Sequence, residues 1–491
     1  MSTHILAIDQ GTTSTRAIVF DAAWKPVKTA QVELTQHYPQ PGWVEHDAEE
    51  IWAATMRVCR EAIGAVGIEN IAAIGITNQR ETTIIWDRAT GAPVHNAIVW
   101  QDRRTAEICA RLREAGHEAR VQALTGLLLD PYFSATKIAW ILDQDPALRR
   151  RAEAGELAFG TIESFLIWRL TGGKAHVSDV TNAARTLLFE IGKADWNDGL
   201  CALLNVPRAL LPKALRCDAH FGDTDPELLG RSLPITGVAG DQQAALVGHG
   251  CLKPGMAKAT FGTGCFLVMN MGDASPRSQN RLLATIAYEA QGRRAYALEG
   301  SIFSAGATMQ WLRDGLKLIK NSAESEAIAA SLPNNGGVYL VPAFAGLGAP
   351  QWNAQARGLI SGLTRDSRLE HLVRAGLEAV AYQTADLLDA LRADGAPKIE
   401  RLLVDGGMTA NAWVMQFLAD ICDVEVARPA FQEMTALGAA KLAALGAGKV
   451  SALADGDGDQ TLWRPSISRA ERETLRRGWA RAVAGSLAAV G

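Results

Sequence analysis

The sequence lacks the cysteine and apolar patterns of a secreted or membrane-spanning protein. Its seven cysteines are odd in number, scattered and without a CxxC pair, which is typical of reduced thiols and argues against a disulfide or zinc framework. The uncharged stretch 327–356 is interrupted by three prolines, so it predicts loops and a buried strand rather than a membrane helix. The N-terminus has no basic segment followed by an apolar stretch, as a signal peptide would. We therefore expect a cytoplasmic protein with no membrane span.

Excess positive charge is absent as well. Lysine and arginine total 49 against 53 aspartates and glutamates, the formal net charge is −4, and no long basic run occurs. A polyanion partner such as nucleic acid is therefore not expected. With 48% apolar and 21% charged residues over 491 positions, the composition is that of a globular protein, and the length suffices for two large domains or three smaller ones.

Several common nucleotide and metal signatures are missing. The chain contains no GxxxxGK[ST], no GxGxxG after a strand, and no HRD followed by DFG, which excludes P-loop, Rossmann and protein-kinase sites. Its nine histidines form no HExxH or other paired spacing, so we expect structural histidines rather than zinc ligands.

The two halves of the chain share one predicted order of elements. Strands are predicted at 4–9, 16–21 and 27–34 in the first half and at 256–261 and 265–270 in the second. A helix is predicted from Asp47, with Glu50 completing a capping box, and another helix is predicted with Ser134 as its cap. We expect an α/β fold of two related domains, residues 1–249 and 250–491, with a substrate cleft between them.

Two hydroxyl-bearing hairpin turns occupy corresponding places in the halves. The first, 9–16, contains Gly11, which permits a tight turn and close approach of a ligand, and three hydroxyl side chains near Arg16. The second, 261–264, follows the first strand of the second half. Either turn alone is more typical of an ordinary hairpin. Two facing turns, however, could hold the phosphates of a nucleotide, with Asp9 placed to hold Mg²⁺ directly or through water.

A third junction could hold the rest of a nucleotide. The strand ending at 405 runs into a Gly-Gly turn and then a predicted helix. Gly407 would permit close approach of a flat base or ribose, and Asn411 with the helix N-terminus would supply hydrogen-bond donors. Alone, such a junction more often serves packing, so it adds weight only together with the two turns.

Three charged residues have side chains suited to binding and activating hydroxyl groups. Arg80 and Glu81 form an adjacent donor and acceptor suited to vicinal hydroxyls, although such a pair is more often solvated on the surface. Asp241 follows the apolar segment 235–239 and could orient an attacking hydroxyl and accept its proton. A helix N-cap is the alternative for Asp241.

Taken in order, these segments resemble the FGGY carbohydrate kinase family, within the superfamily of actin, heat-shock chaperones and sugar kinases, and especially its glycerol-phosphorylating members. The similarity runs from Asp9 to about Trp479. Its motifs include DQGTTSTR (9–16), GITNQRETT (75–83), NAIVWQDRRT (96–105), GDQQAAL (240–246), FGTGCF (261–266) and VDGGMTAN (404–411). The resemblance implies two ribonuclease H-like domains, each a mixed sheet flanked by helices, with ATP, Mg²⁺ and glycerol bound in the cleft between them.

The resemblance also implies roles for individual residues. Asp241 would be the catalytic base, and Asp9 would be the metal ligand. The polyol would contact Arg80, Glu81, Trp100, Tyr132, Asp241, Gln242 and Phe266. ATP would contact Thr12, Thr13, Ser14, Arg16, Thr263, Gly306, Gln310, Gly407 and Asn411. The implied reaction is in-line transfer of the γ-phosphoryl group to glycerol, the first step of glycerol catabolism, and the family often forms homodimers or homotetramers.

Two alternatives stay open at this point. Another FGGY kinase, acting on a pentulose or a different polyol, would share the fold, although the pocket residues match the glycerol pattern at every position named. A non-catalytic or chaperone-like ATPase of the superfamily is the alternative from another class, and the intact Asp9, Asp241 and both turns argue against it.

One departure from the family concerns regulation. Many bacterial members carry a Gly-Gly-Lys-Gly-Gly-type loop linked with inhibition by fructose 1,6-bisphosphate. The corresponding segment here, 221–231, has one basic residue and three acids, which is a poor site for a bisphosphate. We predict weak or absent inhibition by this effector.

Overall fold

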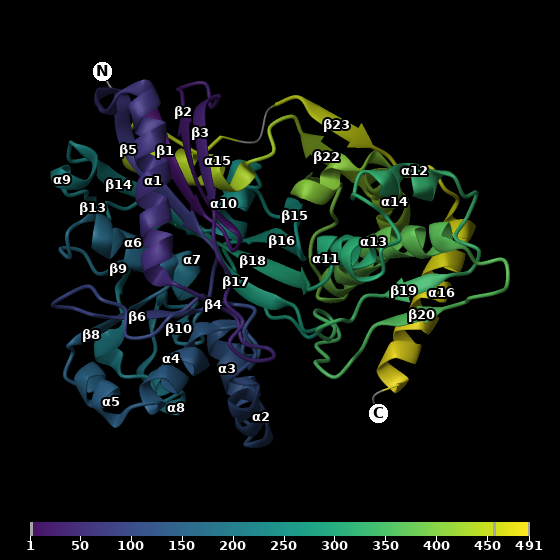
Figure 1. Ribbon diagram of the computed structural model, residues 1–491, viewed down its shortest axis with the longest axis horizontal. Coiled ribbons are helices and arrows are strands. Elements are labelled where there is room, and N and C mark those ends of the chain that lie inside the picture. Colours follow the sequence, from purple (N-terminus) through teal and green to yellow (C-terminus); the bar gives the residue numbers. More distant parts are fainter. Residues whose placement is uncertain (1–2, 455–457, 490–491) are drawn as a thin grey trace.

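The computed structural model describes residues 3–454 and 458–489. The chain builds two mixed β-sheets, one from each half, with helices around them (Figure 1). The first sheet has six strands in the order β13 (Gly222–Asp223), β14 (Pro234–Gly240), β5 (Ile71–Asn78), β1 (His4–Gln10), β2 (Ser14–Phe20) and β3 (Pro26–Glu33). The second has seven, in the order β17 (Leu283–Ala290), β18 (Arg293–Ile302), β16 (Cys265–Gly272), β15 (Ala257–Phe261), β21 (Arg401–Asp405), β22 (Glu425–Pro429) and β23 (Gln460–Trp463).

The two sheets repeat one connectivity. In each, an antiparallel hairpin, β1–β2 or β15–β16, lies beside two parallel strands, β5 and β14 or β21 and β22. The predicted α/β fold of two related halves with mixed sheets is therefore confirmed. The turns of the two hairpins occupy equivalent positions in their sheets.

Helices cover the sheets and fill the space around them. The first half contains α1 (Ala48–Val66), α2 (Ala106–Glu114), α3 (Glu118–Thr125), α4 (Ser134–Asp143), α5 (Pro146–Glu153), α6 (Ile162–Leu170), α7 (Val180–Ala183), α8 (Asp198–Leu203), α9 (Pro226–Leu229) and α10 (Asp241–Gly248). The second half contains α11 (Gly306–Gln310), α12 (Glu324–Ala330), α13 (Leu369–Ala393), α14 (Ala412–Cys422), α15 (Met434–Gly446) and α16 (Arg469–Ala488). Short strand pairs are β4 (Glu45–His46) with β7 (Ala97–Ile98), β6 (Ile84–Asp87) with β8 (Leu157–Gly160), β9 (Val177–Asp179) with β12 (Lys213–Leu215), β10 (Phe189–Glu190) with β11 (Asp195–Trp196), and β19 (Tyr339–Val341) with β20 (Leu359–Ser361).

Two predicted helix caps differ from the structure. Asp47 caps α1 as expected, but the Glu50 carboxylate accepts hydrogen bonds from the backbone N–H and hydroxyl of Thr35, over 3.0 and 2.9 Å, so the capping box is not formed. Ser134 is the first residue of α4 rather than its cap, and its hydroxyl donates to the Glu81 carbonyl over 2.9 Å. In both cases a long-range partner competes successfully with the local one.

Helix α15 comes from the second half but packs on the first sheet. Its apolar side chains form a buried cluster with residues of β1, β2 and β5. The approach is so close that a Cβ at Gly75 would lie 2.3 Å from the Ala439 carbonyl oxygen, and one at Gly438 would lie 1.8 Å from the Ala244 carbonyl oxygen on α10. Helices α10 and α15 therefore meet backbone to backbone and join the two halves.

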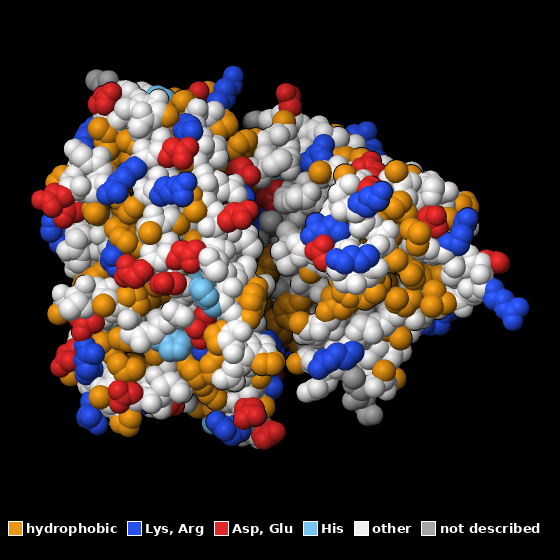
Figure 2. All heavy atoms as spheres, viewed as in Figure 1, with side chains coloured by type: hydrophobic (Ala, Val, Ile, Leu, Met, Phe, Trp, Pro, Cys, Tyr) orange, Lys and Arg blue, Asp and Glu red, His pale blue; other side chains and the backbone are white. Residues whose placement is uncertain are grey.

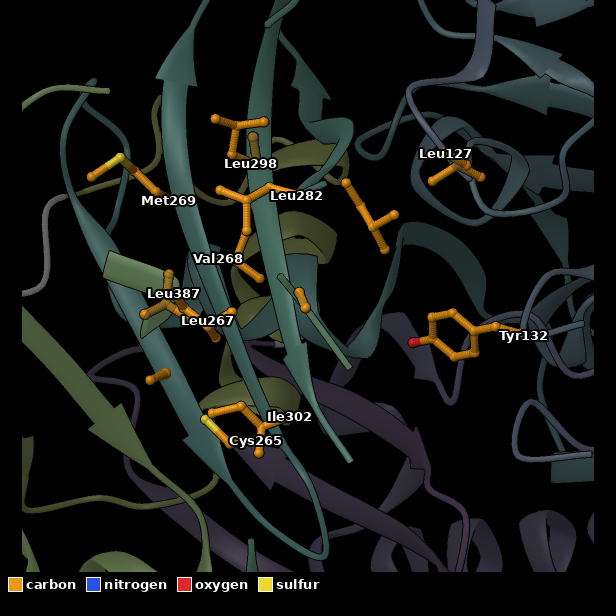
Figure 3. Packing of buried hydrophobic residues seen from close by; sticks show 14 of the residues in the cluster. Leu127, Tyr132, Cys265, Leu267, Val268, Met269, Leu282, Leu298, Ile302 and Leu387 are labelled. Atoms are coloured by element: carbon orange, nitrogen blue, oxygen red, sulfur yellow. The ribbon is translucent and has the colours of Figure 1, made fainter. Parts of the chain in front are cut away.

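The largest apolar cluster also joins the halves. It contains Leu267 and Leu298 from the second sheet and Leu127 from the first half (Figure 3). Tyr132 belongs to the same cluster and points its hydroxyl toward the strands of the second sheet (Figure 3). This shared core positions first-half side chains against the second sheet.

The remaining sequence expectations concern membranes and thiols. Within the described residues, no helix is both long and apolar enough to cross a lipid bilayer. All seven cysteines are buried and unpaired, which confirms the predicted free thiols. Figure 2 shows a groove between the two halves and an outer face on which acidic and basic side chains are interspersed.

Candidate active site

Each predicted phosphate turn is closed by a hydrogen bond from the backbone amide of its first glycine, which spans three residues in the first turn and two in the second. The Gly11 amide donates to the Ser14 carbonyl over 2.9 Å, and the Gly262 amide donates to the Gly264 carbonyl over 2.9 Å. Glycine is required at 264 because a Cβ there would lie 2.6 Å from the Ile302 carbonyl oxygen. The turns thus present backbone and hydroxyl donors at equivalent ends of the two sheets, as phosphate binding requires.

The second turn opens on a pocket of about 410 Å³. Among its lining residues are all five that were predicted for the nucleotide from the second half: Thr263, Gly306, Gln310, Gly407 and Asn411. Asn411 caps α14, and its side-chain amide donates to the Ser325 hydroxyl over 3.3 Å. Ser325 and Arg313 also line the pocket, and no local sequence pattern distinguishes them.

The other predicted nucleotide residues, Thr12, Thr13, Ser14 and Arg16, lie on the first hairpin. The Thr12 hydroxyl accepts a hydrogen bond from the Trp100 indole over 2.9 Å. Arg16 is already engaged, since it forms an ion pair with Glu433, just before α15, and donates to Gln31 over 2.9 Å. A phosphate contact would therefore require Arg16 to share its guanidinium with these partners.

Arg80 lies at the centre of the predicted polyol site and is only 2% exposed. Its Nε lies 3.2 Å from Asp241 Oδ1 and 3.9 Å from Glu81 Oε1. Its Nη2 donates to the Tyr132 hydroxyl over 3.5 Å, and its guanidinium carbon lies 6.0 Å from the centroid of the Phe266 ring. Arg80 and Glu81 are therefore not a solvated surface pair, and the sequence-predicted residues meet around one guanidinium.

Three aromatic rings form a wall of this pocket. The Trp100 ring meets those of Tyr132 and Phe266 edge to face, with centroids 5.7 and 5.8 Å apart. Trp100 and Phe266 are only partly buried, so ring surface is available to a carbon chain. Because Trp100 also bonds Thr12, the wall joins the polyol pocket to the first phosphate turn.

Asp241 is the partly exposed acid of the pocket, with 31% of its side chain accessible. It is the first residue of α10, whose N-cap is Gly240, so the N-cap alternative is wrong. Its Oδ1 accepts a hydrogen bond from the backbone N–H of Gln242 over 2.7 Å. The Gly240 amide in turn donates to the Thr181 hydroxyl over 2.9 Å. This carboxylate is fixed at its base and open toward a ligand.

Glu299 and Arg185 belong to the site although sequence reasoning did not identify them. Arg80 donates to Glu299 over 2.6 Å, and Arg185 donates to Glu81 over 2.6 Å. Burial alone would raise the pKa of Glu299, but Arg185 and Arg80 outweigh it and lower the pKa to about 2. Its place as the single acid of β18 was the available signal for Glu299.

Lys258 is a further buried charge that the sequence did not single out. Its ammonium donates to the Gln242 side-chain oxygen and, over 2.8 Å, to the Thr260 hydroxyl. Burial lowers the pKa of Lys258, while Asp405 and Asp241 act to raise it. Since an ammonium only donates, it directs the oxygen of Gln242 toward itself.

Asp9, the predicted metal ligand, is the second-last residue of β1 and lies close to the first turn. Burial raises the pKa of this carboxyl to about 7, Arg16 opposes the rise, and Glu433 and Asp241 add to it. Among the described residues, no group of three or more His, Cys, Asp or Glu could hold a metal ion. Mg²⁺ in phosphoryl-transfer sites needs only one or two carboxylates besides water and phosphate, so Asp9 fits an ion that arrives with a nucleotide.

Comparison with known proteins agrees with this geometry. Residues 4–248 match the N-terminal domain, and residues 257–447 the C-terminal domain, of the FGGY family of carbohydrate kinases. The chain belongs to this family.

Similar proteins within the family include several named glycerol kinases. Glycerol kinase of Ectopseudomonas mendocina is 57% identical over 488 residues, which cover 98% of this chain and 99% of that protein. The crystal structure of Plasmodium falciparum glycerol kinase with ADP has a TM-score of 0.91 at 37% identity and covers 99% of this chain and 98% of that one. Xylulose kinase from Rhodospirillum rubrum has a TM-score of 0.85 at 26% identity, with 98% of both chains covered.

Proposed function

We propose that the protein transfers the γ-phosphoryl group of ATP to glycerol and forms sn-glycerol 3-phosphate. The observation that carries the proposal is the convergence of Arg80, Glu81 and an aromatic wall on the partly exposed Asp241. The Trp100–Thr12 hydrogen bond connects this pocket to the first phosphate turn. Relatives at 57% identity that are named glycerol kinase support the same choice.

Each part of the pocket has a chemical role in this reaction. Arg80 donates to a hydroxyl and Glu81 accepts from its neighbour, while the aromatic rings cover the carbon chain. Asp241 orients the attacking primary hydroxyl and accepts its proton. Gln242, held by Lys258, offers its amide N–H groups to the substrate. Exclusion of water from the groove between the halves prevents wasteful ATP hydrolysis.

The nucleotide would occupy both hairpins and the pocket beside the second. The turns that contain Thr12 and Thr263 would hold the phosphates, and the pocket bounded by Gly407 and Asn411 would take the adenosine. Asp9 would hold Mg²⁺, directly or through water. The ion, when bound, supplies charge neutralisation at the transferring phosphoryl group.

Replacing Asp241 by Asn tests the assigned base. We expect kcat for glycerol to fall by about 10²–10⁴-fold, the usual contribution of a general base, while nucleotide affinity in an equilibrium titration stays within about twofold because the amide keeps the shape of the side chain. Asp198→Asn, at a site 87% exposed, is the matched control. Near-normal kcat in the Asp241 variant would remove the role.

The alternative substrates and the alternative class are separated by two assays. Competition of glycerol with erythritol, xylulose and dihydroxyacetone addresses a kinase for another sugar or polyol, whose fold would be the same. ADP release with and without glycerol addresses a chaperone-like ATPase, which would not respond to the polyol.

The cellular context is proposed on the same basis. We place the enzyme in the cytoplasm as a homodimer or homotetramer, with domains at 1–249 and 250–491, and with little or no inhibition by fructose 1,6-bisphosphate. Light scattering after size exclusion measures the assembly. Inhibition at micromolar fructose 1,6-bisphosphate would contradict the regulatory prediction.

A further inference from the structure

Two arginines beneath the polyol pocket share one carboxylate, that of Glu299. Arg80 donates through Nη1 and Nη2 to the two oxygens of Glu299, over 2.6 and 3.0 Å. Arg185 donates through Nη2 to Oε1 of the same carboxylate over 2.9 Å, and through Nε to Glu81 over 2.6 Å. Glu299 therefore holds Arg80 directly and Glu81 through Arg185.

Burial shields the four side chains of this arrangement from water. The side chains of Arg80, Glu81, Arg185 and Glu299 are at most 2% exposed, and their two positive and two negative charges balance. The Nη1 atom of Arg185 already has no hydrogen-bond partner. No solvent can replace the Glu299 carboxylate, so its loss would leave an unbalanced guanidinium pair in a low-dielectric site.

Glu299 comes from the other half of the molecule. It lies in β18, where it pairs with Val268 of β16 and Leu283 of β17. Strand β16 also carries Phe266 of the aromatic wall and follows the second hairpin turn. Arg80, Glu81 and Arg185 all belong to the first half, so a carboxylate of the second sheet completes a polyol site built mainly from the first.

We propose that Glu299 is a positioning residue for recognition of adjacent hydroxyls, an inference that rests on the proposed function. It sets the direction of the Arg80 guanidinium and, through Arg185, of the Glu81 carboxylate, without touching the substrate. The recognised feature is a vicinal diol, in which one hydroxyl accepts from Arg80 while its neighbour donates to Glu81.

The substitution Glu299→Gln tests this role with little change of shape. The amide oxygen can keep the three bonds that Oε1 accepts, from Arg80, Arg185 and the Ser301 hydroxyl, but the amide nitrogen would face Arg80 Nη1, donor against donor. Arg80 must then rotate. We expect kcat/KM for glycerol to fall by about 30-fold, mainly through KM, as for loss of a charge-assisted hydrogen bond.

A second ligand distinguishes positioning from general damage. Propane-1,3-diol has no adjacent hydroxyls, and its affinity can be measured as competitive inhibition against glycerol. If Glu299 acts through hydroxyl recognition, Glu299→Gln raises the inhibition constant of this diol by less than about threefold. Equal losses for both ligands, or no loss for glycerol, would overturn the inference.

Two further variants separate a positioning role of Glu299 from a general loss of stability. Glu378→Gln removes the charge from another buried pair, with Arg374, outside the pocket, and should change thermal stability without changing the ratio of the two ligand constants. If Glu299→Gln does not fold, Glu299→Asp is used instead. It keeps the negative charge but shortens the side chain by one methylene, and the constants for glycerol and propane-1,3-diol are compared in the same way. Absence of glycerol kinase activity in the wild type would defeat the proposed function alone, whereas wild-type activity with an unaffected variant defeats only this inference.

Discussion

A single methyl group at Gly438 would test whether the contact between α10 and α15 is set by the backbone. A Cβ at this position would lie 1.8 Å from the Ala244 carbonyl oxygen and 2.5 Å from its carbonyl carbon. Backbone atoms of a packed helix cannot step aside as the end of a flexible side chain can. Gly438→Ala must therefore push α15 away from α10.

Two opposing effects decide the sign of the stability change. Alanine favours a helix over glycine by about 1 kcal/mol. Against this, reaching an acceptable contact distance requires the helices to separate by about 1 Å, and forced overpacking costs typically about 1–3 kcal/mol or more. The close approaches at Gly75 and Gly237, which face the same helix, would be strained as well. Because a 1.8 Å approach to a backbone atom is severe, the upper end of that cost applies, and we expect a net loss of about 2 kcal/mol or more.

Gly64→Ala provides the matched control. Gly64 lies inside α1, and a Cβ there would meet nothing within 4 Å. This substitution should stabilise the protein by up to about 1 kcal/mol through helix propensity alone. Urea unfolding followed by circular dichroism measures both changes. If Gly438→Ala proves as stable as the wild type or more so, the close-approach argument is refuted.

The same variant should also lose activity. Asp241 opens α10, and Glu433, the ion-pair partner of Arg16, immediately precedes α15. A shift of about 1 Å in the catalytic groups can cost about 10²-fold in rate, so we expect kcat for Gly438→Ala to fall at least tenfold, whereas Gly64→Ala keeps the wild-type kcat.

Two further predictions concern other buried groups. Burial and the nearby Arg88 guanidinium lower the pKa of His176 to about 4, against the opposing effect of its hydrogen bond to the Phe159 carbonyl. The neutral ring donates to that carbonyl and accepts from Arg88, so stability should fall by about 3 kcal/mol as pH drops from about 6.5 to 4. His176→Gln can keep both bonds, so urea titrations at several pH values should show a flatter acid slope, and an unchanged slope would argue against this origin. Lys258→Met frees the amide of Gln242 to rotate and should raise KM for glycerol about tenfold in steady-state assays. A defect confined to nucleotide affinity would contradict that role.

The predictable part of the site lies in residues whose neighbours in sequence are unusual. Gly11 and Gly264 mark turns, at Gly264 because a Cβ would collide with the Ile302 carbonyl oxygen, and Asp241 follows a buried strand where a carboxylate has no packing use. Arg80 and Glu81 stand side by side at the end of β5. Local chemistry therefore indicated the hairpins and a possible use for Arg80, Glu81 and Asp241. The family motifs supplied the roles of these residues and added Trp100, Tyr132, Gln242 and Phe266 to the polyol site.

The unpredicted part depends on contacts between segments far apart in sequence. Glu299 is the single acid of β18 and Lys258 the single base of β15, but nothing near them in sequence reveals that an arginine or a glutamine from another segment lies opposite. Likewise, α15 is apolar on nearly all sides, which indicates a buried helix but not which surfaces it covers. The glycines at 75 and 438 acquire meaning only once both backbones are placed.

The contacts between the two halves explain how the architecture would serve the proposed reaction. A polyol pocket made by one half alone would bind its ligand independently of the nucleotide site on the other half. Here the second sheet supplies Glu299 and Phe266 to the polyol pocket, while α15 from the second half supports the sheet that carries Asp9. Under the proposed function, each half would therefore hold groups that orient the other's ligand, and correct placement of a hydroxyl beside a phosphate would follow from the contact between the halves rather than from either one.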